Sequence, residues 1–115
     1  MTTNLRISLE EIDQKIILRL EGKIDASSTP LLEKKIDSLI KEGHIFLLFD
    51  LHRIVYLSSA GLRLFLSAMK KLKEKKGGLI LFSGGEEINE IIKMAGFDRI
   101  FPICSNEKEA LQYKL

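Results

Sequence analysis

Two adjacent hydroxyl groups, those of Ser58 and Ser59, stand between the apolar run Val55 to Leu57 and a segment with helical periodicity. A serine at the start of a helix accepts a hydrogen bond from an unpaired backbone N–H, so one of the two is expected to act as an N-cap. A cap does not need both hydroxyls. The other would lie at the positive end of the helix dipole, where the negative charge of a phosphoryl group is stabilised. The pair therefore predicts a phosphorylation site at one of these serines.

Serine hydrolase chemistry is the other use of such a hydroxyl, and the surrounding residues do not favour it. The nucleophile elbow of hydrolases requires a glycine two residues before the serine, where this chain has Tyr56 or Leu57. A general base would have to come from His44 or His52, and both are expected to lie in solvent at strand ends. Two histidines without a further ligand at suitable spacing also predict no metal site. We therefore expect no catalytic residues, and a small hydrolase is the least favoured function.

The other residues with chemical potential are interpreted as structural. The segment Gly77 to Gly85 lacks the lysine of a P-loop and the spacing of a dinucleotide fold, so we expect turns and no cofactor. The basic run Lys70 to Lys76 interleaves with apolar residues and is interpreted as a solvated helix face. Cys104, the only cysteine, is expected to be a small core residue and can form no intrachain disulfide.

Charge and hydropathy narrow the choice of partners. With 18 basic and 16 acidic residues, the formal net charge of +2 indicates neither a nucleic-acid partner nor an anionic membrane surface. The N-terminal residues carry no signal-peptide pattern, and the apolar runs are far shorter than the about 20 residues that cross a bilayer. We therefore predict a cytoplasmic protein with no direct nucleic-acid or membrane partner.

Hydrophobic periodicity predicts a single domain, residues 1–115, with the element order β-β-α-β-α-β-α-β-α. Strands are expected at 5–11, 15–21, 45–51, 79–82 and 100–103, with Pro102 indicating that the last lies at a sheet edge. Helices are expected from an N-cap at Thr29 to Gly43, from the double serine to Gly77, over 86–95, and after a cap at Ser105 or Asn106. The predicted fold is α/β, with a mixed, mostly parallel sheet of about five strands, an N-terminal hairpin strand at an edge and about four helices.

Binding groups in such sheets gather where strands run into helices. Here those junctions are 25–29, 58–62 and 83–86. The N-terminal hairpin is followed in order by G-K-I-D-A at 22–26, F-D-L-H-R-I-V-Y-L-S-S-A-G-L-R-L at 49–64 and A-G-F-D-R-I-F at 95–101. Together these segments resemble the STAS domains of bacterial anti-sigma factor antagonists.

The resemblance implies a non-catalytic switch that binds an anti-sigma factor serine kinase and thereby frees a sigma factor for transcription. It also implies that the kinase phosphorylates a serine at the start of the second helix, and that a serine phosphatase removes the phosphate. Carried over by position, the phosphoacceptor is Ser59, two residues before Gly61, with Ser58 as the alternative. Asp25 matches an acidic residue that helps to form the partner surface. The chain has Ser58 and Ala60 where the family commonly has an aspartate and a serine or threonine.

The junctions and the resemblance together predict a partner-binding surface. Its residues are Asp25, Ala26, Ser27, Ser58, Ser59, Ala60, Gly61, Leu62, Arg63, Ser83 and Gly84. A second function stays open on the same fold, namely a constitutive scaffold that docks into a signalling or transport complex without phosphorylation. In that case the double serine is helix-start chemistry alone.

Overall fold

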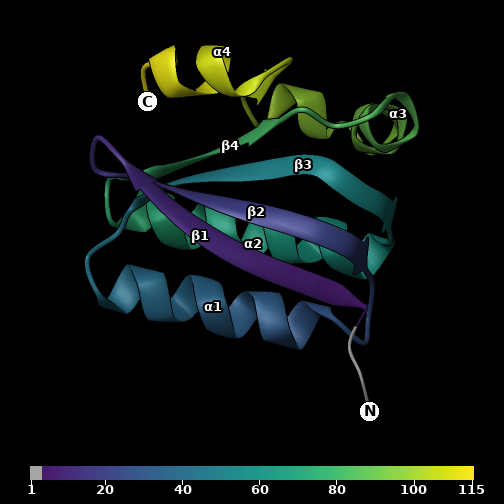
Figure 1. The fold of residues 1–115 in the computed structure, drawn as a ribbon, viewed down its shortest axis with the longest axis horizontal. Coiled ribbons are helices and arrows are strands. Elements are labelled where there is room, and N and C mark those ends of the chain that lie inside the picture. The colour runs from purple at the N-terminus through teal and green to yellow at the C-terminus, as the bar shows by residue number, and fades with distance from the viewer. Residues whose placement is uncertain (1–3) are drawn as a thin grey trace.

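The computed structural model describes residues 4–115 and contains a sheet of five strands in the spatial order β1-β2-β3-β4-β5 (Figure 1). The strands are β1 (Leu5–Ile12), β2 (Lys15–Ile24), β3 (Phe46–Leu57), β4 (Gly78–Phe82) and β5 (Ile103–Cys104). The helices are α1 (Thr29–Lys41), α2 (Ser59–Glu74), α3 (Glu86–Met94), the 3₁₀ turn η1 (Phe97–Arg99) and α4 (Glu107–Gln112). β1 runs antiparallel to β2, and the later neighbours are parallel. The predicted α/β class, edge hairpin and mixed sheet are confirmed.

The helices cover the sheet on both faces. α1 and α2 lie side by side on one face, and α4 lies on the opposite face (Figure 1). Ile16, Leu18 and Leu20 of β2 belong to the larger core, which also holds the buried side chains of α1 and α2. Ile17 points the other way, into a smaller core that it shares with Ala110 of α4. This burial on both faces explains why the central strands are nearly continuous apolar runs.

The hairpin depends on Asp13 and Gln14, whose φ angles of 49° and 68° are both positive. Two successive residues with positive φ form the turn whose twist matches that of the flanking antiparallel strands. Ile12 and Lys15 pair directly across this turn. The predicted hairpin is confirmed, and its second strand runs beyond the expected range to Ile24.

The predicted N-cap of α1 at Thr29 is wrong by one residue. The cap is Ser28, Thr29 is the first helical residue, and Pro30 follows within the first turn. The carbonyl of Ser28 accepts hydrogen bonds from the backbone of Leu31 at 3.1 Å and Leu32 at 3.3 Å. The helix therefore begins directly after Ser28.

The third strand is longer than the 45–51 predicted, because β3 continues to Leu57. His52 and Arg53 interrupt the apolar run, so the continuation is hidden in the sequence. β2 nevertheless stays beside β3 over its whole length, with register shifts on the way, and Ile24 pairs with Leu57 at the end. The strand therefore leads directly to the double serine, without a linker.

The last strand also differs from its predicted position at 100–103. Gly96, with a φ of 78°, leads into η1, and β5 is only Ile103 and Cys104. Pro102 precedes the strand, and its carbonyl accepts a hydrogen bond from Leu81 N–H at 3.1 Å. The edge position is confirmed. Cys104 packs against the smaller core but stays partly exposed, and burial raises the pKa of its thiol.

No helix within residues 4–115 is long and apolar enough to cross a membrane.

Candidate functional site

The two serines at the start of α2 have different environments. Ser58 is the N-cap: its backbone is extended, and its hydroxyl oxygen accepts a hydrogen bond from Gly61 N–H at 3.3 Å. Ser59 is the first helical residue and is exposed, and its hydroxyl makes no hydrogen bond to any residue from 4 to 115. The expected cap is therefore Ser58, and the hydroxyl that stays available is that of Ser59.

Gly61 brings the first turn of α2 close to the ends of two strands. A Cβ at this position would lie 2.6 Å from Leu57 Cδ1, 2.8 Å from Ile24 Cγ2 and 3.2 Å from Ile24 O. Glycine is thus needed here because a side chain would not fit, and not because of the backbone conformation. In addition, Ser58 N–H donates to Ile24 O at 2.9 Å. The end of β2 and the start of α2 are therefore held together, and Asp25 follows directly on Ile24.

Asp25 organises the loop between β2 and α1. Its Oδ1 accepts hydrogen bonds from the Ser27 hydroxyl at 2.7 Å, from Ser27 N–H at 3.0 Å and from Ser28 N–H at 3.1 Å. The hydrogen bond from the Ser27 hydroxyl is the main cause that lowers the pKa of Asp25. The loop therefore presents a fixed negative charge at neutral pH.

Ser28, which was predicted only as part of the junction 25–29, fixes the other side of this loop. It is fully buried, and its hydroxyl donates to Lys23 O at 2.8 Å and accepts from Asp25 N–H at 2.9 Å. Both functions of a buried hydroxyl are thus satisfied. No feature of the local sequence distinguishes Ser28 from Ser27, because only the packing buries one of the two.

A groove between α1 and α2 borders the serines. It has a volume of about 330 Å³ and is lined by Thr29, Pro30, Glu33, Ala60, Arg63, Leu64 and Ser67. Arg63 is exposed and forms no ion pair with the described residues, whereas Glu33 reaches Lys71 at 3.9 Å. The prediction included Ala60 and Arg63 but missed the α1 side. The rule that parallel strands are joined by right-handed crossovers places both helices on one face of the sheet. This rule could have predicted that α1 lies beside α2 at the groove.

Exposed apolar side chains adjoin the same region. Val55 and Tyr56, which precede Leu57 at the end of β3, are 67% and 48% exposed. The sequence showed them only as part of an apolar run. Exposed apolar and aromatic groups are typical of the centre of a protein interface. Leu62, which was predicted to bind a partner, is only partly exposed and packs against the larger core.

Ser83 and Gly84 lie away from the serines. β4 ends next to Asp50 of β3, whereas β3 itself continues to Leu57. At about 3.3 Å per residue, roughly 20 Å of strand separates these two places. The structure thus groups the predicted residues of the Asp25 loop with those of α2, and it leaves Ser83 and Gly84 outside that group.

Catalysis finds no support in this arrangement. His44 precedes β3 and is half-buried, and His52 is exposed within β3, roughly 20 Å of strand before Ser58. Neither histidine can serve as a base for the serines. In the described part of the chain, no group of three or more His, Cys, Asp or Glu residues could hold a metal ion. What the arrangement offers is a surface on which the Ser59 hydroxyl is exposed and has no hydrogen-bond partner among residues 4–115.

Comparisons with known proteins agree with this picture. The model of the STAS domain matches residues 6–110. The anti-sigma-B factor antagonist of Listeria monocytogenes is 31% identical over 108 residues, which cover 92% of this chain and 94% of that protein. A crystal structure of an anti-sigma factor antagonist from Mycobacterium paratuberculosis matches with a TM-score of 0.86 and 26% identity, over 93% of this chain and 91% of that one.

The anti-sigma factor antagonist SpoIIAA has the same fold in two forms. Its unphosphorylated structure matches with a TM-score of 0.80 over 92% of this chain and 93% of that one. Its phosphorylated structure matches with a TM-score of 0.73 over 92% of this chain and 96% of that one. Both are 22% identical to this chain, so they speak for the fold alone. On the STAS match and the Listeria relative, this chain belongs to the STAS-domain family of anti-sigma factor antagonists.

Proposed function

We propose that this protein is a partner switch: its unmodified form binds an anti-sigma factor that is also a serine kinase, and phosphate on Ser59 ends that binding. The family assignment makes the protein a non-enzymatic regulator whose partner is an anti-sigma factor. The observation that carries the finer proposal is the free, exposed hydroxyl of Ser59 beside the bonded hydroxyl of Ser58. A kinase can reach Ser59 without breaking any contact of the fold.

The position of Ser59 also explains how phosphate would act without unfolding the domain. A phosphoserine carries about −1.5 to −2 charges, and the start of a helix stabilises such a group. A docked partner would have to desolvate that dianion and meet its charge, which weakens the complex. The carboxylate of Asp25, in the adjoining loop, adds charge of the same sign. Removal of the phosphate by a serine phosphatase would restore binding.

Ser58 is the less suitable phosphoacceptor. Its hydroxyl accepts the capping hydrogen bond from Gly61 N–H, and its own N–H is bound to Ile24 O. A phosphate on Ser58 would have to replace the cap of α2. The proposal therefore assigns the modification to Ser59 and the structural role to Ser58.

Intact-mass spectrometry and phosphopeptide mapping, on protein isolated from its own cells with and without stress, test the proposal. One phosphoryl group on Ser59 that varies with growth condition is the expected result. Ser59→Ala should bind the anti-sigma factor permanently and Ser59→Asp should not bind it, while Ser58→Ala, the matched control, should still be modified. Partner affinity that neither Ser59 change affects would overturn the mechanism.

A constitutive scaffold is the second candidate. It is favoured by Ser58 and Ala60, which stand where the family commonly has an aspartate and a further hydroxyl. Under this function the surface around Asp25 and α2 docks permanently into a larger complex. An unmodified protein in every growth condition, still bound to a partner, would support it over the switch.

A further inference from the structure

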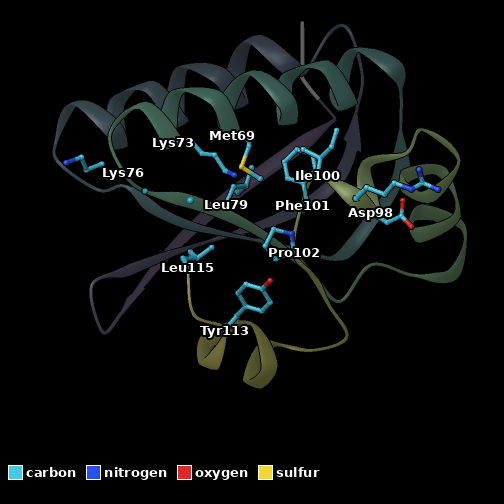
Figure 2. Close-up of a pocket in the computed structure, with 13 residues that line it drawn as sticks. Met69, Lys73, Lys76, Leu79, Asp98, Ile100, Phe101, Pro102, Tyr113 and Leu115 are labelled. Carbon is cyan, nitrogen blue, oxygen red and sulfur yellow. The ribbon is translucent and has the colours of Figure 1, made fainter.

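A second hollow lies at the other end of α2 from Ser59. It has a volume of about 600 Å³ and opens between the last turns of α2, the start of β4, the segment 98–102 and the C-terminal residues (Figure 2). Its volume falls in the range of about 300–1,000 Å³ that is usual for small-molecule sites. It shares no residue with the predicted partner-binding surface or with the groove between α1 and α2.

The floor and one wall of this hollow are apolar. The buried side chains of Met69, Leu79 and Phe101, which belong to the larger core and are 4%, 0% and 3% exposed, lie beneath its floor. Ile100, Tyr113 and Leu115 border it and are 44%, 43% and 48% exposed. These exposed side chains leave apolar surface open to water inside the hollow, and a bound ligand would cover that surface.

The C-terminal residues form part of the wall through a close contact with β4. A Cβ at Gly78 would lie 2.8 Å from Leu115 Cδ2, so the leucine side chain rests on the glycine. In Figure 2, the ring of Tyr113 lies below Pro102 with its hydroxyl directed toward it. This wall thus consists of the apolar side chains of Leu115 and Pro102 and the hydroxyl of Tyr113.

The rim carries mostly positive charge. Lys73, Lys76 and Arg99 line the hollow, and Asp98 is the acidic residue among its lining residues. Lys71, in the same helix, pairs with Asp37 at 2.9 Å, whereas Lys73 forms no ion pair or side-chain hydrogen bond within the described residues. In Figure 2 the side chain of Lys73 runs toward Met69 and Leu79, so its amine is directed over the apolar floor. An unpaired cation beside apolar surface favours a ligand with an acidic head and an apolar body.

We propose that this hollow binds a small amphiphilic carboxylate, that is, a soluble monocarboxylic acid with an aliphatic chain. Its carboxylate binds the Lys73 ammonium, and its chain lies against Ile100, Tyr113 and Leu115, the lining side chains that stay exposed. This site is a function beyond partner switching, because the two lie at opposite ends of α2. The ligand and the anti-sigma factor are therefore able to bind at the same time.

Calorimetric titration of the whole protein with octanoate and decanoate, each below its micelle concentration, tests the site. Decanoate should bind in a one-to-one ratio, and each added CH₂ should tighten binding up to about fourfold while the chain is inside the hollow. Decanol, with the same chain and no charge, should bind at least roughly tenfold more weakly. Equal affinity for decanol and decanoate, or no saturable binding of either, would overturn the proposal.

Variants at two positions of α2, Lys73 and Lys70, locate the ligand. Lys73→Glu should weaken decanoate binding at least roughly tenfold, and Lys73→Met should have the same direction with less effect on the fold. Lys70→Glu makes the same charge change in the same helix outside the hollow, and it should bind as the unchanged protein does. Equal losses in Lys73→Glu and Lys70→Glu would show a general charge effect and overturn the site.

Amide chemical shifts give an independent location. Decanoate should shift the signals of Leu79, Ile100 and Phe101 in a ¹⁵N–¹H spectrum and leave those of Asp25 and Ser59 unchanged. Ile100→Ser, an exposed position, should reduce the affinity without loss of folding. Shifts confined to the groove between α1 and α2 would place the ligand elsewhere and contradict the inference.

Discussion

Arg19 of β2 and Glu107 of α4 form an ion pair with an N–O distance of 2.7 Å, which fastens the C-terminal helix to the sheet. The same guanidinium reaches Glu10 of β1 at 2.7 Å and Asp50 of β3 at 2.9 Å. The hydrogen bond to Glu107 is the main cause that raises the pKa of Arg19 above its ordinary value. One permanent cation thus connects three strands and α4, on the face opposite the helix pair α1 and α2.

Arg19→Met should destabilise the protein and loosen α4. It removes the ion-pair partner of Asp50 Oδ2, in a side chain that is only 16% exposed, and it releases Glu107. We expect a loss of about 1–2 kcal/mol in the free energy of unfolding. Urea denaturation measures the loss, and faster amide exchange in α4 locates it.

The matched control for Arg19→Met is Lys71→Met. Lys71 bonds Asp37 at 2.9 Å across an exposed surface, so its removal should cost less than about 1 kcal/mol. An equal cost for the two changes, or unchanged exchange in α4 of Arg19→Met, would show that the Arg19 cluster does not hold the helix.

The two serines should differ in their effect on stability. Ser58→Ala removes the cap of α2 and should lower the free energy of unfolding by about 1 kcal/mol. Ser59→Ala removes a hydroxyl without a bonding partner in the described structure and should stay within about 0.5 kcal/mol of the unchanged protein. Paired urea denaturation curves test this difference. The reverse order would mean that Ser59, and not Ser58, caps the helix.

Gly61→Ala should destabilise the protein although alanine favours helices. Its Cβ would overlap Leu57 Cδ1 and Ile24 Cγ2, at 2.6 Å and 2.8 Å. Overpacking of this kind costs about 1–3 kcal/mol, which equals or exceeds the gain of about 1 kcal/mol in helix propensity. We expect a lower denaturation midpoint and shifted amide signals at Ser58. Ser59→Ala, in the same turn, is the control, and a stabilised Gly61→Ala would contradict the close approach.

The sequence predicted those parts of the fold that local chemistry determines. The hairpin followed from the alternation on both sides of Asp13 and Gln14. The last helix followed from a capping residue, and Asn106 is the one that caps it, with its side chain accepting a hydrogen bond from Glu109 N–H at 2.9 Å. The double serine was interpreted as one cap and one free hydroxyl, and the structure shows that division.

What the sequence could not predict depends on contacts between distant segments. The end of β3 is a strand because β2 runs beside it, although His52 breaks the apolar pattern. Ser83 follows a strand, as the Asp25 loop does. However, β4 ends with Phe82 paired with Asp50, and this register places Ser83 far from Ser58 along β3. The α1 side of the groove with Glu33 required the packing of two helices, which no local pattern contains.

The charge of Asp25 should make part of the stability depend on pH. The pKa of Asp25 in the folded protein is lower than its ordinary value of 3.8, so the unfolded chain binds the proton more strongly. The contribution of the carboxylate is therefore complete above about pH 5 and is lost as the pH falls through 3.8 toward the folded pKa. The difference in stability between the unchanged protein and Asp25→Asn should shrink between pH 5 and pH 3. A difference that grows toward low pH would contradict this sign.

Ser27→Ala should raise the pKa of Asp25 toward its ordinary value. The Ser27 hydroxyl is the first cause of the lowered pKa and donates to Asp25 Oδ1 at 2.7 Å. An NMR titration of the side-chain carboxyl carbon measures this pKa directly. Ser38→Ala, which changes an exposed serine in α1 far along the chain, should leave it unchanged. No shift in Ser27→Ala would mean that the backbone N–H bonds alone hold the charge.

The groove between α1 and α2 should carry more of the partner affinity than the Ser83 loop does. Ala60→Arg fills the groove beside Ser59, and Arg63→Glu reverses its exposed charge, so each should weaken capture of the anti-sigma factor at least roughly tenfold. Both positions are partly or fully exposed, so the fold should tolerate the changes.

Ser83→Gly is the control for these two variants. Ser83 has a φ of 58°, which glycine adopts without strain, and it lies roughly 20 Å of strand away from the serines. Calorimetric titration with the purified partner compares the three variants. If Ser83→Gly loses partner affinity and neither Ala60→Arg nor Arg63→Glu does, the interface lies around the Ser83 loop. The free hydroxyl of Ser59 would then lie outside the interface.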